Sequence, residues 1–288
     1  MTRVGARGDA AVATAVTHAV TALFVPGNRP ERFGKALKAG ADLVIVDLED
    51  SVEVGGRAAA TRTTVAAFDD EGFDVVVRVS GGGIDDSEQL QALLDANAHG
   101  SGTLLGILVP KAESVDGIAA LIRKLPDGVA CIPLIESAAG VLAAEGIARL
   151  AGVTRLAFGA VDFALDIGAD ADGGGAVLDF ARATLVVASR GAGIAPPLDS
   201  PSLEIANTDA VARAGRSARA LGFGGKLCIH PVQVPVVASA FAPSTEQLDW
   251  ARRVVSAEGD AVQIDGMMID RPVVDRARRF LRGAGEKH

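Results

Sequence analysis

Polar or ionisable side chains stand at the end of each apolar, strand-length run of this sequence. They are Asn28 and Arg29, Asp47, Glu49 and Asp50, Arg78, Lys111, Glu136, Asp162, Asp199 and His230. Carboxylates are ligands that hard cations prefer, and an arginine can grip a carboxylate through two parallel hydrogen bonds. The set predicts a site that combines a divalent cation with an acidic substrate.

Two of these carboxylates, Glu136 and Asp162, end neighbouring predicted strands. Like charges in a partly buried site are costly unless a cation neutralises them. Mg²⁺ fits, because it needs few carboxylates, keeps several waters and lets substrate oxygens complete its octahedron. We therefore expect Mg²⁺ as the cofactor, with Mn²⁺ as a possible substitute. Zinc is disfavoured, because the sequence has no cluster of histidines and cysteines.

The acidic residues at the end of the second predicted strand support this site. We expect Asp47, Glu49 and Asp50 to hold water molecules bound to the metal. For Asp47 or Asp50 taken alone, the better interpretation is that it caps the following turn. Lys111 is expected next to the metal site in a salt bridge with nearby glutamates, rather than as an imine-forming lysine.

Arginines supply the positive charge of the predicted site. Arg78 lies within Val-Val-Val-Arg-Val (75–79), where a charge that points into the fold needs a partner. That partner is either a substrate carboxylate or Glu49 or Asp47, and the sequence leaves both open. Asn28 and Arg29 are candidates for substrate binding. Arg29 and Arg32 either bind phosphates or lie on the surface of the first helix.

Strand-length apolar runs alternate with helical periodicity along the chain. The predicted strands are Ala22–Pro26, Asp42–Glu49, Asp74–Val79, Leu104–Lys111, Val129–Glu136, Arg155–Asp162, Ile194–Asp199 and Gly225–His230. The seventh is the weakest, because Pro196 and Pro197 interrupt it.

Eight strand–helix units predict an α/β protein with a (β/α)8 TIM barrel and a C-terminal helical tail. The barrel is expected over residues 21–258, after an irregular segment over 1–20. The tail, 259–288, looks appended to the barrel and able to contact a neighbouring subunit. An open nucleotide-binding sheet is disfavoured, because the first strand is followed by Gly27-Asn28-Arg29-Pro30 and not by G-x-G-x-x-G.

Composition narrows the class further. The 288 residues carry a formal net charge of −8 and only 4% aromatics, which disfavours a nucleic-acid binder. No run reaches the length of about 18 apolar residues that a membrane span needs. Cys131 and Cys228 lie in apolar runs and are expected to be buried free thiols of a cytoplasmic protein.

Eight motifs occur in a fixed order along the chain. They are Leu-Phe-Val-Pro-Gly-Asn-Arg-Pro-Glu-Arg (23–32), Val-Asp-Leu-Glu-Asp (46–50), Val-Arg-Val (77–79), Val-Pro-Lys-Ala-Glu-Ser (109–114), Leu-Ile-Glu-Ser-Ala (134–138), Phe-Gly-Ala-Val-Asp-Phe (158–163), Ile-His-Pro-Val-Gln-Val (229–234) and Met-Ile-Asp-Arg-Pro (268–272). In this order the chain resembles the citrate lyase β-subunit-like branch of the HpcH/HpaI aldolase superfamily, over residues 21 to 282.

The resemblance implies a magnesium-dependent carbon–carbon lyase, an oxo-acid lyase, that acts on a β-hydroxyacyl-CoA such as malyl-CoA or citramalyl-CoA. The products would be acetyl-CoA and an α-keto acid, glyoxylate or pyruvate. By motif position, Glu136 and Asp162 would be the Mg²⁺ ligands and Arg78 would bind the keto-acid carboxylate. Asp270 would be the acid/base group, delivered to a neighbouring subunit of a homotrimer or homohexamer. We place Glu49 with Arg78 and Asp270 among the catalytic residues.

Three positions depart from the family pattern. Ser80 stands where the family usually has Asn, and Val54-Gly55-Gly56-Arg57 replaces a Pro-x-x-Lys segment that helps to hold CoA. The loop after the seventh strand keeps only Asp199 of Tyr-Pro-Asp-Phe. We assign CoA phosphate contacts to Arg32 and Arg57. Three alternatives stay open: malyl-CoA thioesterase or synthase activity, a citryl-thioester or free-aldol lyase that does not use CoA, and a non-catalytic barrel subunit.

Overall fold

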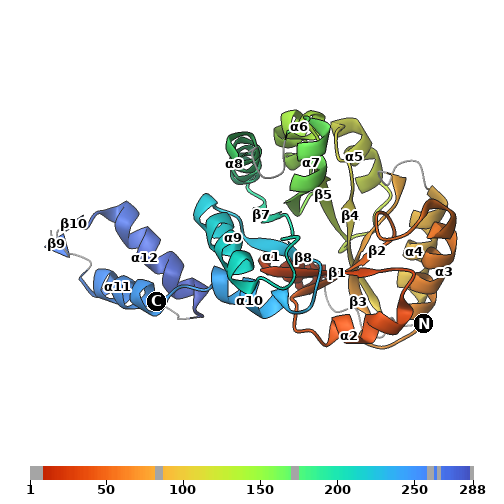
Figure 1. Cartoon of the computed structure of the whole chain (residues 1–288), viewed down its shortest axis with the longest axis horizontal. Helices are drawn as coiled ribbons and strands as arrows, with labels where there is room; N and C mark the ends of the chain where they lie inside the picture. The colour runs from red at the N-terminus through yellow and green to blue at the C-terminus, as the bar shows by residue number, and fades with distance from the viewer. Residues whose placement is uncertain (1–8, 82–86, 170–174, 258–262, 265–266, 286–288) are drawn as a thin grey trace. The chain divides into compact units, whose positions relative to one another are not determined.

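A closed barrel of parallel strands dominates the computed structural model (Figure 1), which describes residues 9–81, 87–169, 175–257, 263–264 and 267–285. Neighbouring strands pair in chain order, and β8 closes on β1. The strands are β1 (Thr21–Pro26), β2 (Leu43–Asp47), β3 (Asp74–Arg78), β4 (Thr103–Val109), β5 (Ala130–Ile135), β6 (Arg155–Phe158), β7 (Ala195–Asp199) and β8 (Gly225–Cys228). This confirms the predicted (β/α)8 barrel.

The strand sequences explain this sheet. Strand β2 reads Leu-Val-Ile-Val-Asp and is buried along its whole length, as parallel strands covered by helices require. The predicted weak strand, β7, does form, although Pro196 and Pro197 have no N–H to donate to a neighbouring strand. Its pairing with β6 is irregular, with a register shift between Arg155 and Ala157.

Helices follow the strands around the outside of the barrel (Figure 1). They are η1 (Pro30–Arg32), α2 (Phe33–Leu37), η2 (Val54–Gly56), α3 (Arg57–Ala67), α4 (Ser87–His99), α5 (Val115–Ile122), α6 (Ala138–Ala148), α7 (Ala160–Asp166), α8 (Gly175–Ala192), α9 (Thr208–Leu221) and α10 (Gln233–Phe241). Two of these helices have a serine N-cap: the Ser114 hydroxyl accepts a backbone N–H of α5, and the Ser137 hydroxyl accepts one of α6.

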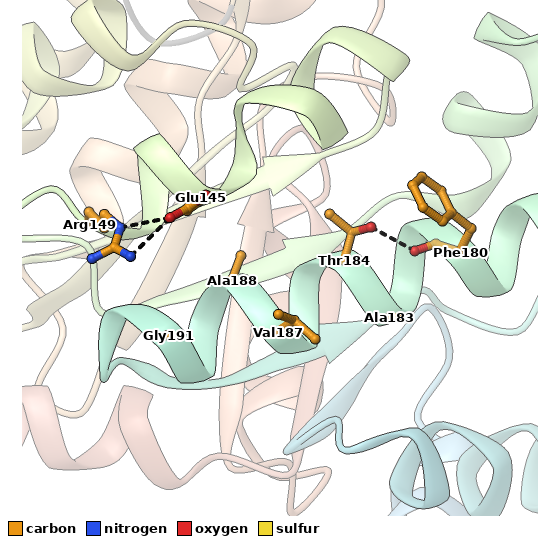
Figure 2. Close-up of a pocket in the computed structure, with 8 residues that line it drawn as sticks. All are labelled: Glu145, Arg149, Phe180, Ala183, Thr184, Val187, Ala188 and Gly191. Carbon is orange, nitrogen blue, oxygen red and sulfur yellow. Dashed lines mark hydrogen bonds and ion pairs between the residues drawn. The ribbon is translucent and has the colours of Figure 1, made fainter.

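Helices α6 and α8 pack against each other and leave a cavity of about 510 Å³ on the outer face (Figure 2). Phe180 and Val187 of α8 line it, and a Glu145–Arg149 ion pair stands at its side. No residue of the predicted catalytic site lines this cavity.

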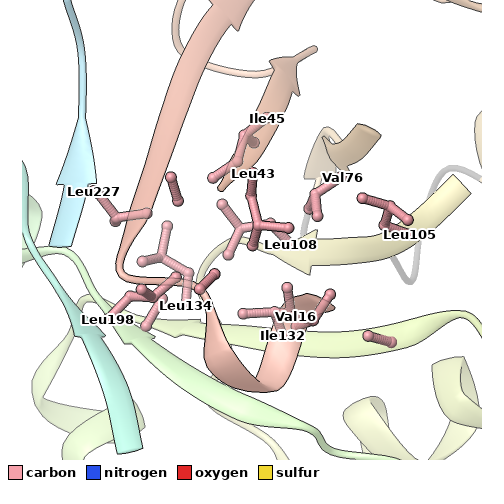
Figure 3. Close-up of a cluster of buried hydrophobic side chains, with 14 residues drawn as sticks. Val16, Leu43, Ile45, Val76, Leu105, Leu108, Ile132, Leu134, Leu198 and Leu227 are labelled. Carbon is pink, nitrogen blue, oxygen red and sulfur yellow. The ribbon is translucent and has the colours of Figure 1, made fainter. Parts of the chain in front are cut away.

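The barrel interior is filled by aliphatic side chains that point inward (Figure 3). They include Leu43, Val76, Leu108 and Ile132, each at most 1% exposed. Val16, from an additional helix α1 (Asp9–His18), is fully buried in the same cluster. Residues 1–20 were expected to be irregular, and this prediction is wrong for residues 9–18. Residues 1–8 lie outside the described part.

Arg155 shows why this N-terminal helix is part of the fold. The guanidinium is completely buried and donates hydrogen bonds to the carbonyls of Val16 and Ala19, at 2.9 and 2.8 Å, and to that of Pro196. Burial lowers the pKa of Arg155 to about 10, although Asp42 acts against this. The arginine therefore ties the end of α1 to β6 and β7, and the helix covers the amino-terminal end of the core.

The chain forms two compact units, Met1–Val237 and Ala238–His288. The second unit contains α11 (Thr245–Ser256), the short strands β9 (Gln263–Ile264) and β10 (Met267–Met268), and α12 (Arg271–Gly283). Helices α11 and α12 share their own small core of Ala251, Val254, Val274, Ala277 and Leu281. The boundary predicted from sequence, at 258/259, differs because it leaves α11 with the barrel.

Candidate active site

A cavity of about 380 Å³ opens where the barrel strands end at their carboxyl termini. Asp47 and Asp50 line it from the end of β2, Arg78 from β3, Glu136 from β5 and Asp162 from α7. This end of a TIM barrel is where active sites of this fold lie. Five of the residues predicted from strand ends therefore meet in one cavity.

Arg78 is held by a set of carboxylates. Its Nε and Nη2 donate to the two oxygens of Asp47, each at 2.7 Å, and its Nη1 donates to Asp50 at 2.9 Å. Nη1 also lies 3.3 Å from Glu49 Oε2, and the guanidinium stands over the Phe24 ring at 5.0 Å. Of the two readings left open by the sequence, the pairing with Asp47 and Glu49 is thus present.

Asp47 serves two functions at once. Besides binding Arg78, it accepts hydrogen bonds from the backbone N–H groups of Glu49 and Ser51, each at 3.0 Å. Burial raises the pKa of Asp47, but the bonds and charge of Arg78 outweigh this and hold the pKa below its usual value. The capping interpretation of Asp47 is therefore confirmed, whereas its expected role in holding metal-bound water stays a prediction.

Two buried glutamates behave differently. Burial raises the pKa of Glu136 to about 8, and the Glu49 and Asp162 carboxylates add to this rise against the hydrogen bond from Lys111. Burial likewise raises the pKa of Glu49 to about 7, although Arg78 lowers it. Each glutamate is only 4% exposed. Crowded, buried carboxylates of this kind are stabilised by a cation that neutralises them.

The backbone around Glu136 is shaped to fit its carboxylate. Lys111 has a φ of 50°, a left-handed conformation that is unusual for a residue with a side chain, and its N–H donates to Glu136 Oε1 at 2.7 Å. On the other side, a Cβ on Gly159 would lie 2.6 Å from Glu136 Oε2, so only glycine leaves room for the carboxylate there. The Lys111 ammonium lies 3.9 Å from Glu49 Oε1.

These residues fit a magnesium ion. Glu49 Oε2 is buried and has no hydrogen-bond partner in the described part of the chain, although Arg78 Nη1 lies 3.3 Å away, so this oxygen has room for a further polar partner. Among the described residues, no three His, Cys, Asp or Glu side chains converge as a ligand set. A site of two carboxylates suits Mg²⁺, which keeps several waters and takes substrate oxygens, and Glu136 and Asp162 are the pair that would hold it.

One prediction about Asp162 is wrong. The sixth strand was expected to run from Arg155 to Asp162, but β6 ends at Phe158 and Asp162 lies in the first turn of α7. The strand ends at Phe158 because the next residue, Gly159, is already the N-cap of helix α7. Asp162 nevertheless reaches the cavity, from a helix start instead of a strand end.

The remaining predicted binding residues do not line this cavity. Asn28 and Arg32 are exposed after β1, and Arg29 is engaged by Glu31 at 2.6 Å. Arg57 begins α3, with its Nε buried and unpartnered in the described structure. In the second unit, Asp270 accepts from the Val273 N–H at 3.1 Å and so caps α12.

The sequence analysis missed Ser200 and Gly159, which line the cavity, and Lys226, which is buried beside it. Ser200 directly follows Asp199, the predicted end of the seventh strand, so its place at a strand end was a usable signal. Gly159 and Lys226 gave none, because the contacts that define them come from residues distant in sequence.

Buried carboxylates and an arginine gathered at the carboxyl end of a closed parallel barrel define a TIM-barrel enzyme with its site at the strand ends. The family model for HpcH/HpaI aldolase/citrate lyase matches residues 20–231. The chain belongs to this family, which confirms the predicted resemblance and the predicted class, a carbon–carbon lyase.

Three relatives illustrate the match. A citrate lyase subunit beta-like protein of Mycobacterium tuberculosis is 38% identical over 275 residues, which cover 92% of this chain and 95% of that protein. Citramalyl-CoA lyase of Rattus norvegicus mitochondria is 27% identical over 90% of this chain and 84% of its own length. The crystal structure of CitE from M. tuberculosis with magnesium, acetoacetate and coenzyme A superposes with a TM-score of 0.80, at 36% identity, over 93% of this chain and 99% of that one.

Within the described residues, no helix is both long enough and apolar enough to cross a membrane. Both cysteines are buried and unpaired, as expected.

Proposed function

We propose that this protein is a magnesium-dependent lyase that cleaves or forms the carbon–carbon bond of a β-hydroxyacyl-CoA such as malyl-CoA or citramalyl-CoA. The observation that carries the proposal is the pair of Glu136 and Asp162 beside Arg78 in one cavity at the barrel mouth. The relatives support the substrate class, since one is named a citramalyl-CoA lyase and another binds magnesium, acetoacetate and coenzyme A.

In this proposal, Glu136 and Asp162 would hold Mg²⁺. When bound, Mg²⁺ would supply Lewis-acid stabilisation of the negative charge that develops on substrate oxygens. Glu136 is fixed for this purpose by the Lys111 N–H on one side and by Gly159 on the other. The two glutamates are each only 4% exposed, and charge interactions are stronger in such a buried setting than in bulk water.

Arg78 would bind the carboxylate of the keto-acid half. Its Nη1 is engaged by Asp50, whose side chain is 57% exposed, while the Asp47 side chain is 4% exposed. Asp47 therefore orients the guanidinium permanently, whereas a substrate carboxylate competes with Asp50 for Nη1. Glu49, with a pKa near 7, is able to take up or release a proton next to this group.

Asp270 is the proposed acid/base group that protonates the carbon left by cleavage, or removes that proton in the condensation direction. We propose that it is supplied by the tail of a neighbouring subunit in a homotrimer or homohexamer. CoA phosphates would be held by basic residues of the β1 and β2 loops, with Arg32 and Arg57 as the candidates.

The deciding experiment is an assay of a panel of acyl-CoA esters, in the presence of Mg²⁺ and in excess chelator, with Glu136→Gln as the inactive control. We expect release of acetyl-CoA and an α-keto acid from malyl-CoA or citramalyl-CoA with Mg²⁺ only. Equal turnover in chelator would refute the metal's role. Hydrolysis without a keto acid would indicate a thioesterase, and turnover of free hydroxy acids alone would exclude CoA use.

A further inference from the structure

Ser200, in the loop directly after β7, connects that loop to the turn between β6 and α7. Its hydroxyl accepts a hydrogen bond from the Ala160 N–H and donates one to the Phe158 carbonyl at 2.8 Å. The first N–H groups of a helix lack partners within it, and Gly159, at the N-cap of α7, has no side chain to provide one. Ser200 therefore caps this helix from a different strand–helix unit.

Ser200 is itself held by a buried network of charged side chains. The Lys226 ammonium donates to the Ser200 carbonyl and, at 2.9 Å, to Asp199 Oδ2. The other oxygen of Asp199 accepts from Arg182 Nε at 2.9 Å. Lys226, Asp199 and Ser200 are each at most 3% exposed. Contacts from β8 and α8 thus fix the backbone at the end of β7, from which the Ser200 hydroxyl reaches Ala160 and Phe158.

The turn that Ser200 caps holds residues of the proposed metal site. Gly159 lies against the Glu136 carboxylate, and Asp162 stands in the first turn of α7. A second anchor fixes the end of the same helix, because Asp166 accepts the Ala138 N–H at 2.8 Å. With both anchors in place, a short helix cannot rotate, and the direction of Asp162 is set relative to Glu136.

We propose that Ser200, held by the Lys226–Asp199 pair, is a positioning residue that sets Asp162 opposite Glu136. A hydroxyl is required because the group must accept from Ala160 and donate to Phe158 at the same time. The inference rests on the proposed function in one respect, namely that Glu136 and Asp162 together bind the divalent cation.

The test is Mn²⁺ binding to the full-length chain without substrate, measured as free Mn²⁺ by electron paramagnetic resonance. Groups that orient metal ligands typically change metal affinity by about 10- to 100-fold when removed, and we expect Ser200→Ala to weaken Mn²⁺ binding by this factor. Ser200→Thr keeps the hydroxyl and should bind Mn²⁺ like the wild type. Ser189→Ala is the matched control, since Ser189 is 1% exposed and its hydroxyl has no partner in the described structure.

A purely structural serine would lower the melting temperature and leave the Mn²⁺ affinity alone. Equal Mn²⁺ affinity in Ser200→Ala and Ser189→Ala would therefore overturn the proposal, and so would a Ser200→Thr variant as weak as Ser200→Ala. If Ser200→Ala does not fold, Arg182→Gln takes its place in the test. This variant removes the Arg182–Asp199 ion pair, which is part of the same network as Ser200. Loss of Mn²⁺ binding in Ser200→Ala together with a wild type that turns over no acyl-CoA would refute the proposed reaction and leave this inference standing. A wild type that binds no Mn²⁺ would overturn both.

Discussion

At the scale of single residues, burial separates the two aspartates that bind Arg78. Asp47 is 4% exposed and binds through both oxygens, whereas the Asp50 side chain is 57% exposed. Removing one partner of a buried pair costs about 3–5 kcal/mol, because the other charge is left uncompensated. Exposed pairs contribute only about 0.2–1 kcal/mol. We predict losses of these sizes for Asp47→Asn and Asp50→Asn, measured by urea unfolding.

Each variant serves as the matched control for the other, because both replace an aspartate that binds Arg78 with its neutral isostere. Equal losses in unfolding free energy would show that burial does not decide the strength of these contacts. For turnover, Asp50→Asn should lower KM for the acidic substrate, since it removes the competitor at Nη1.

The raised pKa values of Glu136 and Glu49 predict how stability depends on pH. A carboxyl whose pKa is higher in the folded state than in the unfolded chain binds its proton more tightly when folded. Its contribution is therefore fully present below the ordinary value of 4.5 and is lost as pH rises toward about 8 for Glu136 and about 7 for Glu49. In chelator, the melting temperature should fall across this window.

Glu136→Gln should flatten that fall, because the amide does not titrate. Added Mg²⁺ should raise the melting temperature most at the alkaline end, where the carboxylates are ionised and free to bind it. The reverse order, with the largest effect of Mg²⁺ at low pH, would contradict the assignment of these groups.

At the scale of elements, α1 is one part of the barrel that the sequence analysis missed. Val16 of this helix is fully buried in the core, while Val187 of α8 is 71% exposed. Val16→Ala removes buried methyl groups and should cost about 2 kcal/mol of unfolding free energy. Val187→Ala, the same change on the surface, should stay within about 0.5 kcal/mol. Urea unfolding of both variants checks this, and equal values would mean that α1 does not support the core.

The pattern of correct and missed elements has a physical cause. The barrel strands are predictable because burial on both faces requires apolar runs such as Leu43–Asp47, and the site follows because active groups stand where those runs end. Helix α1 was missed because its role depends on Arg155, far along the chain, which bonds the carbonyls of Val16 and Ala19. The start of α7 was missed for a similar reason, since its cap is Ser200 and not a neighbouring residue.

At the scale of the whole molecule, the residues of the proposed reaction are divided between two compact units. Glu136, Asp162 and Arg78 belong to Met1–Val237, whereas Asp270 belongs to Ala238–His288. In the second unit, α11 and α12 have their own core, so that this unit is more than an unstructured extension of the barrel. A separate, self-packed unit is the kind of element that can be presented to a neighbouring subunit.

The proposed assembly predicts that two inactive variants recover activity when they are mixed in one oligomer. Glu136→Gln chains lack a metal ligand and Asp270→Asn chains lack the acid/base group, so each variant alone should be inactive. If Asp270 acts in the neighbouring subunit, mixed oligomers contain sites built from the intact barrel of one variant and the intact tail of the other. With random assembly at equal amounts, about a quarter of the sites are complete in a closed ring.

Co-expression of the two variants, followed by an assay of acyl-CoA cleavage, measures this recovery. A mixture of Glu136→Gln and Asp162→Asn chains is the matched control and should stay inactive, because both changes fall in the same barrel and no pairing restores the metal site. If Asp270 instead served the barrel of its own chain, every site in the first mixture would lack one group, and that mixture would be as inactive as the control.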